Sequence, residues 1–134
     1  MIFLDSSFLI SFGVEKDSNH EKAVEVMKEI AKGKYGEAFI SDYIFDETIT
    51  VTLARTKSLS KAVIAGTGMK KSYSIEKVDD RIFEEAWGFF QSQKQTIFSF
   101  TDCTNIFVMQ ESNIKNIATF DEDFKKVKGI NVIS

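Results

Sequence analysis

Short runs of apolar residues alternate along the chain with longer stretches in which apolar residues recur every three or four positions. The short runs contain few polar residues, which is typical of strands buried on both faces of a parallel sheet. They predict five strands, at Ile2–Leu4, Ala38–Ser41, Tyr73–Val78, Ile117–Thr119 and Ile130–Ile133.

The longer stretches predict helices between these strands. The clearest one begins after Ser18 or Asn19, either of which can cap it, and ends at Gly33. Further helices are predicted over Asp42–Arg55, from Ser60 into the 66–68 region with its two glycines, after the cap at Asp79, over Thr101–Glu111 and, as a short turn, over Glu122–Val127. The helix after Asp79 has an expected apolar face of Ile82, Phe83, Ala86, Phe89 and Phe90.

The alternation of strands with helices favours a parallel sheet, because each connection between parallel strands needs a long crossover. The expected fold class is therefore α/β, with a single domain of 134 residues and three α/β/α layers around a five-stranded parallel sheet. A hydrophobic content of 43% is sufficient for one core. In this architecture ligands gather at the carboxyl ends of the strands.

The cysteine and histidine content limits the disulfides and metal sites that the chain can form. With only Cys103 and His20, the chain has no internal disulfide and cannot form a closed zinc site of Cys and His ligands. Twenty Asp and Glu residues offer instead the oxygen ligands that Mg²⁺ and Mn²⁺ prefer. We expect no signal peptide and no membrane-spanning segment, and together with the unpaired thiol this predicts a cytoplasmic protein.

Two acids follow predicted strands. Asp5 comes directly after the first strand and before Ser6 and Ser7, whose hydroxyls can orient the carboxylate or cap the next helix. Asp121 comes two residues after the fourth strand, with Asp123 just beyond it. We expect Asp121 to be the inner ligand of a site at this edge, and Asp123 to be a peripheral or water-mediated ligand or only a helix cap.

Two further acids lie on predicted helices. Glu47 falls within an apolar stripe of Ile44, Val51 and Ala54, which places an acid on the inward face of its helix. Asp102 lies in the first turn of its helix, where stabilisation of the helix N-terminus would be a better explanation than catalysis for an isolated acid. The functional interpretation therefore depends on all of these acids converging.

Carboxylates gathered at one point repel one another unless a cation neutralises them or some remain protonated. We therefore predict that Asp5, Glu47, Asp102 and Asp121 hold Mg²⁺ or Mn²⁺. Such an ion lowers the pKa of a water, aligns it against a phosphodiester and stabilises the leaving oxygen. The predicted chemistry is hydrolytic phosphoryl transfer.

The segments that carry these acids resemble one known family. IFLDSS, SDYIFDETITVTLAR, SFTDCTNIFVM and IATFDEDF, in this order and spacing, resemble a PIN domain across nearly the whole chain. The resemblance implies a five-stranded parallel sheet, metal-ligand roles for the same four acids, and supporting hydroxyls on Ser6 and Thr119. It also implies a ribonuclease similar to VapC-type toxins, which are held inactive by a cognate antitoxin protein and are commonly homodimers.

A basic stretch lies within this acidic protein of net charge −3. No acidic residue occurs from Thr48 to Ile75. The cations of this stretch are Arg55, Lys57, Lys61, Lys70 and Lys71. We expect them to contact RNA phosphates if they lie beside the acids, and to be solvated or to face a partner if they do not.

Other classes of protein fit the sequence less well. A haloacid-dehalogenase phosphatase would need an acid two residues after Asp5, where Ser7 stands, and a response-regulator receiver would need an acidic pair near the first strand. Ser6 as a nucleophile would need a base, and we expect His20 to be a surface residue and Cys103 to pack in the core. The remaining alternative is a PIN fold that binds RNA or protein without cutting, which the complete set of acids disfavours.

Overall fold

The computed structural model describes all 134 residues and contains a five-stranded sheet in the order β3-β2-β1-β4-β5. Its strands are β1 (Ile2–Leu4), β2 (Ala38–Ser41), β3 (Ser74–Glu76), β4 (Asn116–Ala118) and β5 (Asn131–Ile133). All four neighbouring pairs are parallel. β3 is shorter than the predicted Tyr73–Val78, because the N–H of Val78 donates at 2.9 Å to the side chain of Asp42 instead of to a neighbouring strand.

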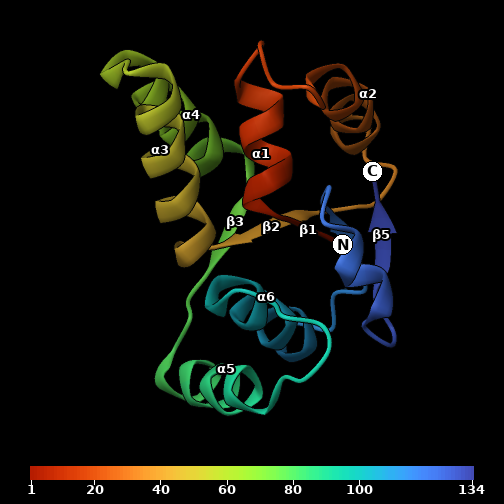
Figure 1. Cartoon of the computed structure of the whole chain (residues 1–134). Helices are drawn as coiled ribbons and strands as arrows, with labels where there is room; N and C mark the ends of the chain where they lie inside the picture. The colour runs from red at the N-terminus through yellow and green to blue at the C-terminus, as the bar shows by residue number, and fades with distance from the viewer.

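The helices are α1 (Ser6–Gly13), α2 (His20–Ala31), α3 (Asp42–Thr56), α4 (Leu59–Ser72), α5 (Asp80–Ser92), α6 (Phe100–Glu111) and the 3-10 helix η1 (Glu122–Lys126). The sheet lies between α1 to α4 on one side and α5 and α6 on the other (Figure 1). This arrangement confirms the predicted three-layer α/β/α fold with a five-stranded parallel sheet. None of the helices combines the length and the apolar character needed to cross a membrane.

The register of the central strands brings strand ends together. Phe3 of β1 pairs with Phe39 of β2 on one side and with Ile117 of β4 on the other. Beyond the end of β1, the N–H of Asp5 donates to the carbonyl of Ala118 at 3.0 Å. Residues that follow β1 and β4 therefore lie side by side at the carboxyl edge of the sheet.

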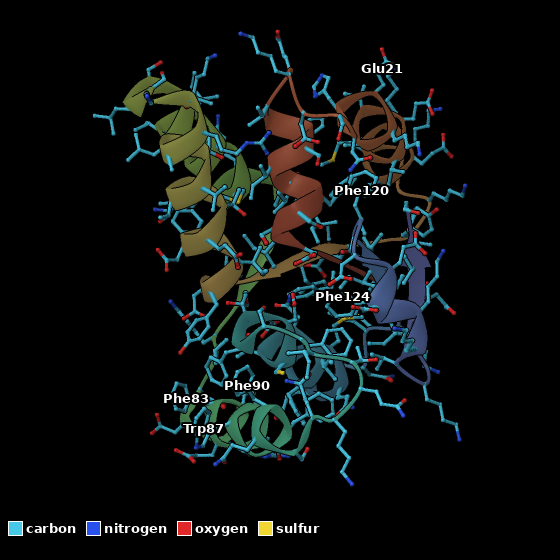
Figure 2. The ribbon with its side chains drawn as sticks, viewed as in Figure 1. Glu21, Phe83, Trp87, Phe90, Phe120 and Phe124 are labelled. Atoms are coloured by element: carbon cyan, nitrogen blue, oxygen red, sulfur yellow. The ribbon has the colours of Figure 1, made fainter.

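The three residues of β1 are fully buried, as expected for the central strand, and belong to one apolar core of 23 buried residues. Phe124 of η1 is also fully buried, and its ring centroid lies 5.2 Å from that of Phe98 (Figure 2). The core thus extends from the sheet to η1, and it anchors the loop that carries Asp121.

The helix predicted to begin at Ser60 is longer than expected. α4 runs from Leu59 to Ser72 and continues through both glycines. A Cβ atom at Gly66 would lie 3.4 Å from Phe45 and 3.4 Å from Ile49. The glycine therefore lets α4 pack closely on α3, and it does not end the helix.

α5 begins as predicted, because the Asp79 side chain caps it. Phe83, which was expected on the buried face, is instead 41% exposed, and Trp87 in the next turn is 46% exposed. Both rings contact Phe100 edge-on, and Trp87 also stacks on Phe90 with 14° between the planes (Figure 2). These aromatic side chains cover one another on the surface of α5 and α6, where the apolar pattern alone placed Phe83 in the core.

Candidate active site

Asp5 accepts hydrogen bonds from four donors at the carboxyl edge of the sheet. It is 3% exposed and is the N-cap of α1. Its Oδ1 accepts from the N–H of Ser6 at 2.9 Å and from the side-chain amide of Asn105 at 3.3 Å. Its Oδ2 accepts from the hydroxyls of Ser7 at 2.9 Å and Thr119 at 2.7 Å. Asp5 thus caps a helix and also bridges α1, α6 and the end of β4.

Two hydroxyls extend this network toward Asp121. Ser7 Oγ accepts from the N–H of Phe120 at 3.2 Å, and Thr119 Oγ1 accepts from the N–H of Asp121 at 3.0 Å. Thr119 is one of the two expected supporting hydroxyls. The other hydroxyl on Asp5 belongs to Ser7, while Ser6 contributes its backbone N–H. The loop after β4 is therefore fixed to the first turn of α1.

Glu47 lies half-buried on α3. The buried face of α3 consists of Ile44, Thr48 and Thr52 and packs against α1, while Ala54 of the predicted stripe is exposed. Glu47 therefore flanks the buried face and does not lie within it. Threonine methyl groups pack in place of the expected Val51 and Ala54, a substitution that the apolar pattern does not reveal.

The environment of Glu47 disfavours its ionised form. Burial raises the pKa of its carboxyl, and the negative charge of Asp5 raises it further. Hydrogen bonding by the hydroxyls of Thr101 and Ser6 lowers the pKa of Glu47 and opposes these effects. The hydroxyl of Ser6 thus acts on Glu47, and its backbone N–H acts on Asp5.

Asp102 is the third residue of α6 and forms a capping box with Ser99. Its N–H donates to Ser99 Oγ at 3.1 Å, and its carboxylate accepts from the N–H of Ser99 at 3.2 Å. Burial and then the negative charge of Asp5 raise the pKa of Asp102 to about 6, against the lowering effect of the Ser99 hydrogen bonds. Asp102 thus stabilises the start of α6, the role that the sequence suggested for an isolated acid. The charges of Asp5 and Asp121 also raise its pKa.

Asp121 and Asp123 both belong to the start of η1. The Asp121 carboxylate caps this helix by accepting from the N–H of Asp123 at 2.9 Å. Asp123 forms an ion pair with Lys126 at 2.6 Å. The charge of Asp121 raises the pKa values of Asp5 and Asp102, so Asp121 shares the electrostatic environment of the other acids.

The four acids at residues 5, 47, 102 and 121 are thus brought together at one end of the sheet. In the present side-chain arrangement, no group of three or more His, Cys, Asp or Glu residues is positioned to hold a metal ion. Asp102 and Asp121 each accept from a backbone N–H at a helix start. In each case the bond uses one carboxylate oxygen and leaves the other without a hydrogen bond.

Two polar residues of the site were missed by the sequence analysis. Asn105 is fully buried and donates to Asp5, and Thr101 acts on Glu47. Asn105 comes three residues after Asp102, so the helical period places it on the same side of α6. A single amide among the apolar residues that follow Cys103 was the available signal.

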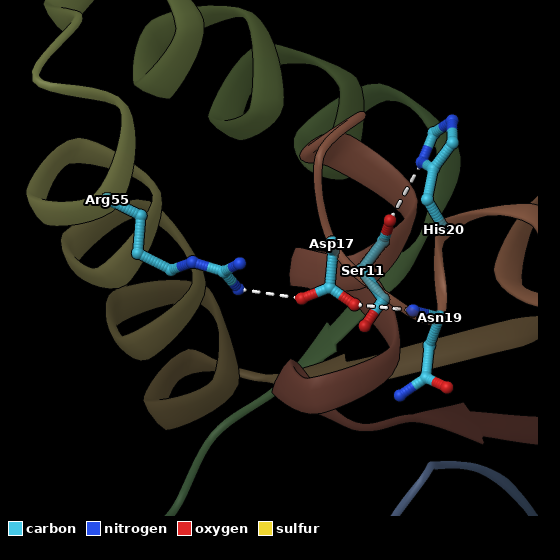
Figure 3. Close-up of polar contacts among 5 residues, drawn as sticks. All are labelled: Ser11, Asp17, Asn19, His20 and Arg55. Carbon is cyan, nitrogen blue, oxygen red and sulfur yellow. Dashed lines mark hydrogen bonds and ion pairs between the residues drawn. The ribbon is translucent and has the colours of Figure 1, made fainter.

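The remaining candidate groups lie outside this network. Cys103 is fully buried, as expected, and burial raises the pKa of its thiol to about 11, which leaves it unreactive as a thiolate nucleophile. His20 was expected to be solvated, but it is half-buried, with Nδ1 2.9 Å from the carbonyl oxygen of Ser11 (Figure 3). This contact ties α2 to α1.

The five predicted RNA-contacting cations lie near the two ends of α4. Arg55, Lys57 and Lys61 lie around the turn between α3 and α4, whereas Lys70 and Lys71 lie in the last turn of α4. At the rise of an α-helix, Lys61 and Lys70 are separated by roughly 13 Å along the axis. Contact of all five with one short RNA segment is therefore less favourable than their spacing in sequence suggested.

Arg55 has a partner within the chain. Its Nη1 lies 2.8 Å from Oδ2 of Asp17, in the loop between α1 and α2 (Figure 3). The guanidinium lowers the pKa of Asp17, and the other Asp17 oxygen accepts from the N–H of Asn19 at 2.9 Å. The ion pair joins the end of α3 to the loop that leads into α2.

We expect replacement of Arg55 by alanine to lower the free energy of unfolding by up to about 1 kcal/mol, because Asp17 loses its partner. Urea unfolding of Arg55→Ala, Asp17→Ala and the double variant measures the coupling between the two residues. Lys61→Ala is the control: it removes a nearby exposed cation that has no ion pair, and it is expected to change stability by less than about 0.5 kcal/mol. Additive effects of the two alanine substitutions would contradict the coupling.

Fold and site together define an α/β protein with a carboxylate cluster at the carboxyl edge of a parallel sheet. Residues 2–130 match the model of the PIN domain family. The chain belongs to the PIN domain family, as its sequence motifs indicated.

Several characterised relatives match over most of the chain. The 23S rRNA-specific endonuclease VapC20 of Mycobacterium tuberculosis is 27% identical over 132 residues, which are 98% of each chain. A VapC ribonuclease of Archaeoglobus fulgidus is 27% identical over 122 residues, covering 90% of this chain and 77% of the relative. The crystal structure of the M. tuberculosis VapC20, described as a sarcin-ricin loop cleaving toxin, superposes with a TM-score of 0.82 at 28% identity over 94% of each chain.

Proposed function

We propose that this protein is a divalent-metal-dependent endoribonuclease and the toxin of a toxin–antitoxin pair. The observation that carries the proposal is the gathering of Asp5, Glu47, Asp102 and Asp121 at the carboxyl edge of the sheet. Besides burial, the charge of Asp5 raises the pKa values of Glu47 and Asp102, and the charge of Asp121 raises those of Asp5 and Asp102. Similarity to two VapC ribonucleases over most of the chain supports RNA as the substrate.

The donor set fits Mg²⁺ or Mn²⁺. Hard cations prefer oxygen ligands, and the cluster offers four carboxylates together with the amide oxygen of Asn105, which is buried and has no hydrogen-bond partner. The raised pKa values show that the ionised cluster is costly without a counter-charge. When bound, the ion supplies an activated water and stabilises charge on the phosphodiester.

The residues of the site would contribute to metal and RNA binding in different ways, according to where they lie. Asp5 is held by four donors and can hold a ligand in a fixed orientation. Asp102 and Asp121 would each contribute the carboxylate oxygen that their helix caps leave free, and Asp123 would contribute through water or remain paired with Lys126. Lys70 and Lys71, at the end of α4, remain candidates for contacts with RNA phosphates.

The same proposal implies the RNA substrate, the protein partners and the cellular location of the enzyme. A structured ribosomal RNA loop is the substrate class, by analogy with the relative described as cleaving the sarcin-ricin loop. A cognate antitoxin would hold the enzyme inactive, the active protein would be a homodimer, and it would act in the cytoplasm.

Cleavage of a labelled rRNA fragment containing a structured loop tests the proposed function. We expect cutting with Mg²⁺ or Mn²⁺, none with EDTA, and a loss of about 100-fold or more in Glu47→Gln. Glu21→Gln is the matched control, because Glu21 is an exposed glutamate on α2 (Figure 2) and forms no hydrogen bond or ion pair with the acids. Metal-independent cutting, or RNA binding with no cutting under any condition, would replace the proposal with a non-catalytic PIN-fold binding module.

A further inference from the structure

The amide of Asn105 is unfavourable for folding stability at its buried position. It is fully buried on α6, within a helix face that otherwise enters the apolar core. Its Nδ2 donates to Asp5 Oδ1, but its Oδ1 is one of two buried side-chain polar atoms in the structure without a partner. An unpaired buried amide oxygen destabilises a fold, so the Asn105 side chain is unfavourable in the core apart from its hydrogen bond to Asp5.

The hydrogen bond from Asn105 is the only one that joins an α6 side chain to Asp5. The other three donors to Asp5 come from α1 and from the end of β4. α6 also carries Asp102, one helical turn before Asn105. The amide therefore connects the helix of one acid directly to the carboxylate of another.

Each oxygen of Asp5 accepts from two donors. The carboxylate therefore cannot rotate without losing hydrogen bonds at both oxygens, and Asn105 supplies one of the two bonds at Oδ1. The unpaired Asn105 oxygen belongs to the amide that donates to Asp5, and it is an acceptor with no protein donor of its own.

From this geometry we propose that Asn105 is a positioning residue for the cation site: it orients Asp5 relative to α6 and supplies a buried oxygen acceptor next to it. The proposal rests on the proposed metal-dependent function. It accounts for a buried amide that is unfavourable for stability, since residues that orient metal ligands strongly affect metal affinity.

Isothermal titration of Mn²⁺ into the whole chain, combined with thermal unfolding, tests this role. We expect Asn105→Leu to weaken Mn²⁺ binding by about 10-fold or more, while the melting temperature falls by no more than about 5–10 °C, the loss expected for one hydrogen bond to a carboxylate. Asn105→Ala, which cannot overfill the site, is expected to show the same loss of affinity.

Thr104→Val is the matched control on the same helix. Thr104 is also fully buried, but its hydroxyl donates to the carbonyl of Thr101 at 2.6 Å and does not contact Asp5. We expect this variant to lose thermal stability and to keep its Mn²⁺ affinity. Unchanged affinity in both Asn105 variants would overturn the positioning role alone, whereas absence of Mn²⁺ binding by wild type would overturn the proposed function and this role together.

Discussion

Replacing Asp102 with asparagine is expected to make the metal-free protein more stable at pH 7 and to remove its RNA cleavage. Burial and the charge of Asp5 raise the pKa of Asp102 to about 6, so ionisation at pH 7 costs folding free energy. Asparagine removes this charge, and its side-chain oxygen can still accept from the N–H of Ser99. After allowance for partial solvent exposure, we expect a gain of roughly 1–2 kcal/mol, or about 4–7 °C in melting temperature.

The raised pKa of Asp102 also predicts the direction in which the stability of the metal-free protein changes with pH. Because the folded state holds the Asp102 proton more tightly than the unfolded state, the metal-free protein loses stability as pH rises from about 4 toward 6 and above. The raised pKa values of Asp5 and Glu47 act in the same direction.

Melting temperatures in EDTA between pH 4.5 and 7.5 measure this effect, and Asp102→Asn should flatten the profile. Glu21→Gln, which changes an exposed glutamate outside the cluster, should leave the profile as in wild type. A wild-type protein that becomes more stable across this range, or an asparagine variant that is less stable at pH 7, would show that the acids do not repel one another as described.

Divalent cations are expected to stabilise the wild-type protein strongly at pH 7 and weakly at pH 5. A bound dication compensates the carboxylate charges, and protons compete with it at the lower pH because the pKa values of Asp5, Glu47 and Asp102 are raised. At a Mn²⁺ concentration of 100 times Kd, linkage gives about 2.7 kcal/mol, or about 8–10 °C for a chain of this size.

Thermal unfolding with and without Mn²⁺ at the two pH values checks this expectation. Asp102→Asn is the informative comparison, since it should gain stability in EDTA and gain less than wild type from Mn²⁺. Equal stabilisation of both proteins, or equal stabilisation at pH 5 and pH 7, would indicate that the ion binds elsewhere.

The fold could be predicted from the sequence because its strands are short, have apolar residues at their centres and are separated by helices. β1 has no exposed residue, and Asp79 caps α5 as expected. The boundaries of α4 were less predictable, because whether Gly66 ends a helix or permits close packing depends on what lies opposite, here Phe45 and Ile49.

The acids at strand ends were likewise accessible from the sequence. Asp5 and Asp121 follow strands of a parallel sheet, whose carboxyl ends share one edge. Glu47 was identified from a stripe that differs from the buried face of α3, and its place beside Asp5 comes from the direction in which α3 leaves β2.

Contacts between residues distant in sequence could not be predicted. The pairing of Arg55 with Asp17 spans 38 positions, and that of Asn105 with Asp5 spans 100 positions. No pattern of neighbouring residues in the sequence indicates either of these contacts. The grouping of the cations of the basic stretch depends in the same way on the turn at Lys57, which reverses the chain between α3 and α4.

Binding of Mn²⁺ to the metal-free protein, followed by the electron paramagnetic resonance signal of the free ion, tests the central claim most directly. We predict that wild type removes Mn²⁺ from solution at pH 7 and that Asp5→Asn, with its fold verified by circular dichroism, binds the ion at least about 100-fold more weakly. Equal binding by the two proteins, or no binding by wild type, would contradict a carboxylate site centred on Asp5.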